Sequence, residues 1–593
     1  MVMTTRGHSP ARARTLGLAS LLSIGALAVA GCYSGPDGRI SETGDVGLSV
    51  GDDTAGDSGD SGDSGVGDSG DTGDTGGEPA QFKPAPASLR LLLARQYQNS
   101  IRDLLGPGAA AVVTPPEDAQ INGLEAIAAA QLALSDAAVD AYESSARQAA
   151  AVALQDVAAL QGYLGCTPIG PDDAACHEQF VRSFGRVAWR RSLLPEEVAL
   201  YVSVAQTAAL EAGDFWTGVE YAIATFLQSP YFLYQVELGV PDADDPSIRR
   251  LTGVELATRM SYFLLDTTPS PELLDEAEGG ALDTAEGVRE VARALLLSDD
   301  ARIALSNFYA EILRLRELEA LPKDPGTYPA WSPQLAAALR VETLTLIEDI
   351  IWQQDGDARD MFDAPYTFAN DTLANFYGLA HPTGGAFSPD YFLKVPLPET
   401  EKRGGILGQG AYLAAFSHIS STSPTLRGKF VREAIMCQTI PPPPPDVVPV
   451  LPDSTADAPT MRDRLEMHME DPACSSCHVM MDGVGFGLEN YDGIGLYRTT
   501  ENGATINTVS VLEPYGEFDG ARALGGRLRE APEVSLCMVR NLFRHATGHV
   551  ERVGELPTLQ EIDEAFAADG FRMQELLAQL VASKAFRMVG APE

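Results

Sequence analysis

The stretch "TGVELATRMSYFLL", residues 252–265, indicates the fold class of the chain. Thr252 is followed three residues later by Glu255. This is a capping-box pattern, in which a hydroxyl and a carboxylate bind the first backbone N–H groups of a helix. Apolar residues then recur every three or four positions, which is the period of a helix with one buried face. The stretch therefore predicts a helix that begins at Thr252.

Similar helical patterns occupy most of the chain after the first 86 residues. The alanine-rich stretch 126–154 has a period near 3.6, and the apolar stripe of 88–106 ends at Gly106-Pro107, a helix stop. Further helical stretches are 333–354 and 557–588. Only "ATINTVSVLE" (504–513) is a weak strand candidate. Because about 510 residues are too many for one core, we expect a mainly α fold of several packed helical modules.

The N-terminus has the pattern of an export signal. Three arginines precede an apolar stretch, 16–30, which is too short to span a membrane comfortably. The stretch ends in "LAVAGC", which resembles the lipobox of bacterial lipoproteins. We expect residues 1–31 to be a lipoprotein signal peptide and Cys32 to carry a diacylglycerol anchor. The alternative is an ordinary signal peptide with an incidental cysteine. Because no aspartate follows Cys32 at the next position, the sorting rule favours the outer membrane.

A low-complexity acidic segment follows the signal. Residues 51–79 contain almost only glycine, serine, threonine and aspartate. Such a composition cannot bury enough apolar surface to offset chain entropy, so residues 32–84 are predicted to be a disordered acidic linker. The formal net charge of the whole chain is −41. This charge argues against nucleic acid as a partner.

Near the C-terminal third, "CSSCH" combines two thiols and a histidine at Cys474, Cys477 and His478. Haem c attachment needs two thiols that reach both vinyl groups of one porphyrin and a histidine for the iron, and CxxCH meets both needs. A zinc site would require Cys437 as a fourth ligand, and a redox dithiol would need a βαβ context. The pattern predicts haem c with His478 as the proximal iron ligand, and zinc and dithiol chemistry remain the alternatives.

The sixth iron ligand is left open by the sequence. His468 lies on a short predicted helix between Thr460 and Asp471-Pro472, which could fold back over the ring. His468 is therefore the first distal candidate. The other candidates are Met467, Met469, Met538, and an open or water-ligated iron.

Four of the seven cysteines remain once Cys32 and the two haem thiols are assigned. Cys166 and Cys176 flank a turn-rich stretch, which leaves Cys437 and Cys537 for each other. Both pairs are predicted to be disulfides in an oxidising compartment. The alternative is four inert buried thiols.

An acidic and aromatic run follows the haem motif and includes Glu489, Asp492 and Arg498. The simpler interpretation is haem-pocket packing, with Arg498 paired to a haem propionate or to Asp492. The other interpretation makes Glu489 or Asp492 a proton relay near the iron.

The order of several segments resembles large haem-bearing proteins of planctomycetes and myxobacteria, which are built from domains of unknown function 1587, 1595, 1592, 1588 and 1585. The segments that carry the resemblance are, in that order, "RLLLARQYQNSIRDLLG", "CHEQFVRSFGRVAWRRSLLPEEV", "RLTGVELATRMSYFLLDTTPSPELL", "HMEDPACSSCHVMMDGVGFGLENYDGIGLYR" and "EVSLCMVRNLFRHATGHVE". The resemblance implies helical modules at 85–165, 166–240 and 245–380, a cytochrome c-like haem module at 400–500, and a C-terminal helical module at 515–590. Where the family commonly has Asp-Pro after the haem motif, this chain has Asp482-Gly483.

Together these features predict a lipid-anchored mono-haem c-type cytochrome of the cell envelope. It would pass electrons between redox protein partners, as an outer-membrane lipoprotein that faces the periplasm or the surface. The first alternative is a peroxidase-like or oxidase-like haem enzyme with an open sixth position. The second is an extracellular scaffold that binds carbohydrate or a protein partner. No catalytic residue is assigned.

The lipid anchor has a direct test. Mass spectrometry of the mature N-terminal peptide should show Cys32 as the first residue, with a lipid adduct. Replacement of Cys32 by serine should abolish the adduct and release the protein from the membrane fraction, because the chain would lose its anchor. A free amino terminus at another residue contradicts the prediction.

Overall fold

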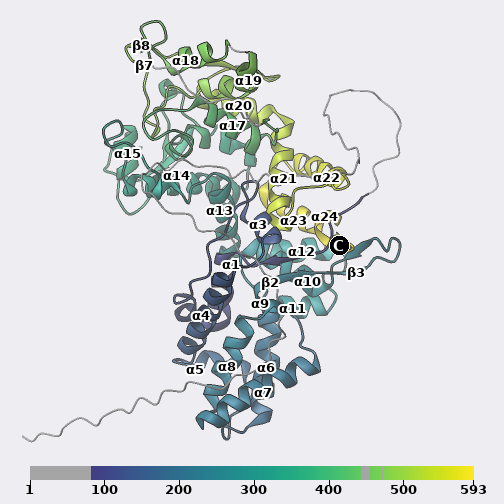
Figure 1. Ribbon diagram of the computed structural model, residues 1–593. Coiled ribbons are helices and arrows are strands. Elements are labelled where there is room, and N and C mark those ends of the chain that lie inside the picture. The colour runs from purple at the N-terminus through teal and green to yellow at the C-terminus, as the bar shows by residue number, and fades with distance from the viewer. Residues whose placement is uncertain (1–81, 442–453, 471, 593) are drawn as a thin grey trace, which may run out of the picture. The chain divides into compact units, whose positions relative to one another are not determined.

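The computed structural model describes residues 82–441, 454–470 and 472–592. These residues are mainly helical, as predicted, and all belong to one unit of the chain, Gly77–Glu593. Figure 1 shows the helices in chain order, with short strands between them. Cys32, the signal peptide and almost all of the acidic linker lie outside the described residues.

In the first part of the chain, a run of helices lies in sequence between two short strands that pair with each other. Strand β1 pairs antiparallel with β2, and Leu89 lies opposite Val236. The elements are β1 (Ser88–Leu91), α1 (Ala94–Leu105), α2 (Pro107–Ala110), α3 (Glu125–Gln131), α4 (Asp136–Ala153), α5 (Val157–Leu160), α6 (Ala174–Trp189), α7 (Pro195–Ala212), α8 (Phe215–Leu227), α9 (Pro230–Leu233) and β2 (Tyr234–Glu237).

The middle part is also mainly helical. Its elements are β3 (Val240–Pro241), β4 (Ile248–Arg250), α10 (Gly253–Leu265), α11 (Pro271–Glu278), α12 (Ala285–Leu295), α13 (Asp299–Ile312), α14 (Pro333–Glu348), β5 (Tyr366–Ala369), α15 (Asp371–Tyr377), β6 (Leu393–Pro396), α16 (Gly410–Ala415), α17 (Pro424–Phe430) and a π-helical turn (Val431–Ile435). Thr252 and Glu255 form the predicted capping box of α10.

The last part contains the helix with the CxxCH motif and the C-terminal helices. Its elements are α18 (Met461–His468), α19 (Pro472–Phe486), β7 (Thr500–Glu501), β8 (Ala504–Thr505), β9 (Val509–Leu512), β10 (Gly516–Asp519), α20 (Ala521–Glu530), α21 (Pro532–Thr547), α22 (Leu556–Ala568), α23 (Met573–Ala582), α24 (Lys584–Arg587) and β11 (Met588–Gly590). β11 pairs antiparallel with β4, and β9 pairs with β10. The weak strand candidate 504–513 therefore contains β8 and β9.

Two predicted helices differ from the structure. The stretch 88–106 begins as strand β1, because Arg90 turns inward and donates to Gln235 Oε1 and to the carbonyl of Ala546. The alanine-rich stretch 126–154 is broken into α3 and α4, because Ser135 caps the N-terminus of α4. A polar contact overrides an otherwise helical apolar pattern in both places: a long-range contact for Arg90 and a local helix cap for Ser135.

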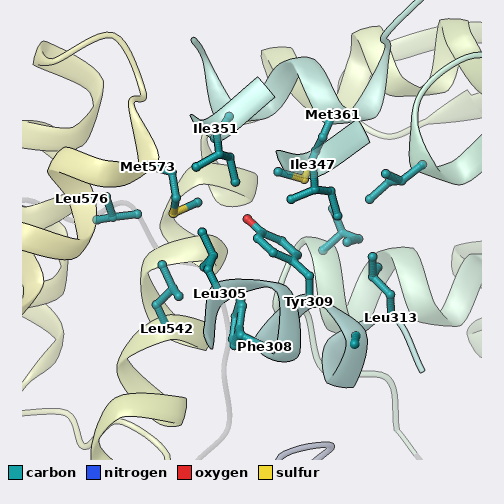
Figure 2. Packing of buried hydrophobic residues seen from close by; sticks show 14 of the residues in the cluster. Leu305, Phe308, Tyr309, Leu313, Ile347, Ile351, Met361, Leu542, Met573 and Leu576 are labelled. Carbon is teal, nitrogen blue, oxygen red and sulfur yellow. The ribbon is translucent and has the colours of Figure 1, made fainter. Parts of the chain in front are cut away.

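Most of the buried apolar side chains form two large cores. One runs from Leu92 to Tyr262, and the other from Leu251 to Val589. Figure 2 shows the second core where side chains from α13 face side chains from the C-terminal helices; the labelled residues include Leu305, Phe308, Tyr309, Leu542, Met573 and Leu576. The predicted modules 245–380, 400–500 and 515–590 all contribute to this second core.

The predicted disulfides are both present. Cys166 pairs with Cys176 and Cys437 pairs with Cys537, with Cα–Cα distances of 5.9 and 5.3 Å. The second bond joins the end of the π-helical turn to α21, across 100 residues of sequence. Among the described helices, none combines the length and the apolar content that crossing a membrane requires.

A carboxyl group lies inside the second core. Glu342 of α14 is fully buried and accepts hydrogen bonds from Thr367 Oγ1 (2.6 Å) and Tyr377 Oη (2.8 Å). Thr367 Oγ1 also accepts a hydrogen bond from Gln409 Nε2, and Tyr377 Oη accepts one from the backbone N–H of Gly410. The hydroxyl protons of Thr367 and Tyr377 therefore point at the carboxylate of Glu342. Burial raises the pKa of Glu342 to about 7, and the two hydrogen bonds oppose this rise.

This carboxyl group predicts a pH-dependent stability. The folded pKa of about 7 is above the ordinary value of 4.5, so the folded chain binds more protons than the unfolded chain between these values. The contribution of Glu342 to the free energy of unfolding should be complete below pH 4.5 and should be lost as pH rises to about 7. The loss should be on the order of 3 kcal/mol, and the free energy of unfolding is measured by denaturant titration.

The Glu342→Gln variant should lack this pH-dependent component, whatever its stability at one fixed pH. Glu290→Gln is the matched control, because Glu290 is exposed on α12. Parallel pH profiles for wild type and Glu342→Gln would contradict the prediction.

Candidate functional site

Helices α17, α18 and α19 form the frame of the candidate site. Cys474, Cys477 and His478 all lie on α19, at spacings of three and four residues that place them on one side of a helix. The structure describes the backbone of Cys474 but not its side chain. His478 is 22% exposed, so its ring lies at the border between the interior and the surface.

Two glycines allow α17 and α19 to approach closely. A Cβ atom at Gly428 of α17 would lie 1.8 Å from the carbonyl oxygen of Met481. A Cβ atom at Gly485 of α19 would lie 1.9 Å from the carbonyl oxygen of Pro424. These distances are far below any real contact, so only glycine fits at either position. The close approach places the side chains of α17 within reach of α19.

A carboxylate orients the imidazole of His478. Nδ1 of His478 lies 2.8 Å from Oδ2 of Asp482, one helical turn further along α19. Thr425 of α17 donates to the other oxygen, Oδ1, at 2.7 Å. The Asp482 side chain is fully buried, and burial raises its pKa, whereas the bonds from Thr425 and His478 oppose the rise. Because Nδ1 is engaged, Nε2 is the nitrogen of His478 that can bind a metal.

His468 lies against His478. The two ring centroids are 5.0 Å apart, and the ring planes meet at 76°. The predicted short helix is present as α18 and begins with a capping box, in which Thr460 and Asp463 are bonded to each other. The helix ends at His468, and α19 begins at Pro472. The sequence-predicted distal candidate is therefore in contact with the predicted proximal ligand.

The methionine candidates have other surroundings. Met467 is 50% exposed, and Met469 packs against Met461 and Phe486. Met538 lines a cavity in the second core with Phe308 and others. Of the four candidate side chains, His468 is the one that the structure places against the ring of His478.

Arg498 has a different partner from the predicted one. It donates to Oε2 of Glu489 at 3.0 Å, and Asp492 instead accepts the backbone N–H groups of Ile494 and Leu496. Asp492 therefore shapes a turn, and the predicted pairing of Arg498 with Asp492 is wrong. Asp492 directly precedes the turn Gly493–Gly495, and an aspartate at the start of a turn is well placed to accept the backbone N–H groups that follow it. This explains why its carboxylate does not pair with Arg498.

Glu489 is enclosed by its partners. Its side chain is 2% exposed and accepts from Thr422 (2.7 Å), Arg427 (3.3 Å) and Arg498. Burial raises the pKa of Glu489, and the two arginines oppose the rise. A carboxylate held by three donors is a structural ion-pair site, and this arrangement gives no support to a proton relay through Glu489.

The structure also bears on the zinc alternative. Cys437 is bonded to Cys537 and cannot serve as the fourth zinc ligand. Within the described residues, no group of three or more His, Cys, Asp and Glu side chains is arranged to hold a metal ion.

The sequence analysis missed Thr425 and Arg427 as residues of the site. It also missed the contact of Asp482 with His478. The spacing of four residues between His478 and Asp482 on one helix was a usable signal for their contact. Thr425 and Arg427 come from α17, about 50 residues earlier in the chain, and their contacts depend on the close approach of α17 and α19.

Comparison with known families gives matches along most of the described chain. The matches are Protein of unknown function (DUF1587) at residues 90–155, DUF1595 at 176–237, DUF1592 at 251–379, DUF1588 at 403–501 and DUF1585 at 516–586. The predicted resemblance to these five families is confirmed. The site described above lies within the DUF1588 match. No curated protein and no solved structure matches the chain significantly.

The close approach of α17 and α19 can be tested by adding a methyl group. Gly428→Ala should lower the free energy of unfolding by about 1–3 kcal/mol or more, because the new Cβ would overlap the Met481 carbonyl. Gly526→Ala in α20 is the control, because nothing lies within 4 Å of its Cβ position. The control should be stabilised by roughly 0.5–1 kcal/mol. Equal denaturation midpoints for Gly428→Ala and Gly526→Ala would contradict the close approach of α17 and α19.

Proposed function

We propose that the chain is an exported mono-haem c-type cytochrome that transfers single electrons between protein partners. One observation carries the proposal. On the helix with the CxxCH motif, His478 is oriented by Asp482, and the ring of a second histidine, His468, lies beside it. Two imidazoles and two adjacent thiols are the groups that a six-coordinate haem c requires.

The residues present fit such a group. Nδ1 of His478 is engaged by Asp482, so Nε2 is the nitrogen left to bind a metal. The ring of His468, the last residue of α18, lies against the ring of His478, so both imidazoles are available at one place. Haem bound here supplies one-electron redox chemistry, which protein side chains lack.

Each protein residue then has a defined task. Cys474 and Cys477 hold the porphyrin through thioether bonds, and His478 and His468 bind the iron. The side chain of Arg498 is 23% exposed, and it would be free to bind a haem propionate while Glu489 fixes its position. If His478 and His468 both bound the iron, these two side chains would leave no position for a substrate, and the chain would act as an electron carrier and not as a haem enzyme.

The two disulfides support an extracytoplasmic location, because such bonds persist in oxidising compartments. We propose that the diacylated Cys32 anchors the protein to the outer membrane and that residues 33–81 act as a tether. The predicted linker ends before residue 84, because Phe82 packs against the second core and Lys83 bonds to Gly554. The envelope is also the compartment in which haem c is attached. The large helical body would then contact the redox partners.

The spin state of the iron tests the proposal. The purified chain should contain one covalent haem, seen in the pyridine haemochrome spectrum, and the ferric form should be low-spin. His468→Ala should convert it to a high-spin form that binds cyanide at least tenfold faster, because one axial position opens. Met467→Ala is the control, since its exposed side chain should leave the spectrum unchanged.

Two results would contradict the proposed electron carrier. A high-spin wild type that binds peroxide rapidly would replace the carrier with a peroxidase-like enzyme. A chain matured in a haem c-competent host without covalent haem would overturn the proposal. Cys477→Ala should reduce the haem stain on a denaturing gel, because one of the two thioether bonds is lost.

A further inference from the structure

The buried carboxylate of Asp482 connects the haem helix to its neighbour. One oxygen faces Nδ1 of His478 at 2.8 Å, and the other accepts the hydroxyl proton of Thr425 at 2.7 Å. The side chain is fully buried, and the titratable side chains that face it are the imidazoles of His478 and His468. Asp482 is therefore a buried carboxylate that is shared between Thr425 of α17 and His478, the proposed proximal iron ligand.

We propose that Asp482 is a positioning residue that sets the reduction potential of the haem. Its carboxylate fixes His478 as the Nδ1–H tautomer, with Nε2 directed at the iron, and its negative charge makes the imidazole a stronger electron donor. The buried charge stabilises ferric iron more than ferrous iron, because the ferric state carries one more positive charge. Asp482 therefore lowers the reduction potential. This inference rests on the proposed function.

Thr425 has the opposite effect on the same carboxylate. Its hydroxyl donates to Oδ1 and draws negative charge away from Oδ2, the oxygen that faces His478. Loss of this hydroxyl would strengthen the bond between Asp482 and His478. The geometry thus predicts that two neighbouring substitutions move the potential in opposite directions, which a simple loosening of the site would not do.

The test is a spectroelectrochemical titration of the purified holoprotein. In Asp482→Asn, which keeps an acceptor but removes the charge, the ferrous-to-ferric ratio at a fixed ambient potential should rise at least tenfold, about 59 mV for one electron. In Thr425→Val the ratio should fall. Thr343→Val is the matched control: its buried hydroxyl binds only the carbonyl of Leu339 within α14, so the ratio should not change. An unchanged or lower potential in Asp482→Asn, or shifts of the same sign in Asp482→Asn and Thr425→Val, would overturn the inference.

A second measurement does not depend on the haem. Nitrogen NMR of the purified full chain with labelled histidine, with assignment by a His478→Gln variant, should show a proton on Nδ1 of His478. The signal should change in Asp482→Asn more than in Thr343→Val. A chain without haem but with the Nδ1–H tautomer would contradict the proposed function and leave the positioning role standing. In the haem-free chain, a proton on Nε2 with Nδ1 unprotonated would overturn the positioning role.

Discussion

The guanidinium of Arg427 holds the candidate haem site together. It is completely buried and donates to the carbonyl oxygens of Leu413, Leu488, Tyr491 and Asp492, as well as to Ser417 and Glu489. These groups belong to α16, to the segment after it and to the turn that follows α19. A buried cation with several well-placed acceptors fixes the conformation of all the segments that supply them. The orientation of α19, and with it His478, depends on this side chain.

A second set of buried charges joins segments that are distant in sequence. Glu237 of β2 pairs with Arg90 of β1 and with Arg259 of α10. Arg90 also donates to the carbonyl of Ala546, and Arg259 to that of Phe586. The DUF1587, DUF1595, DUF1592 and DUF1585 matches therefore meet at one carboxylate. Loss of any one partner would leave a buried charge uncompensated, so these domains are expected to fold as a unit.

Sequence patterns predicted the structural features that depend on residues close together in the chain. The capping boxes at Thr252 and Thr460 are present because a hydroxyl and a carboxylate three residues apart together bind the first backbone N–H groups of a helix. The disulfides followed from counting cysteines, and the five-family order followed from sequence motifs. Strand β1 was missed because its inward-facing Arg90 is satisfied by residues about 150 and 450 positions away. The partner of Arg498 was missed because a carboxylate in a turn can accept backbone N–H groups instead of an ion pair.

The contact between His468 and His478 was predicted only in part. The sequence placed His468 on a short helix before the CxxCH motif, and the structure brings the two rings together. The pairing of Asp482 with Thr425 could not be predicted, because it depends on two glycines that let α17 and α19 approach. Long-range contacts of this kind are set by packing, and no local pattern encodes them.

The bond between Cys437 and Cys537 has a topological consequence. It closes a covalent ring of about one hundred residues, and the CxxCH motif lies on that ring. In the loop-entropy model a ring of this size contributes about 4–5 kcal/mol to stability. A single peptide-bond cleavage inside the ring would open it without separating the two pieces. A nicked molecule would therefore keep α19 linked to α21 until a reductant cleaves the disulfide, and under oxidising conditions damage to the chain would not release the fragment that carries the CxxCH motif.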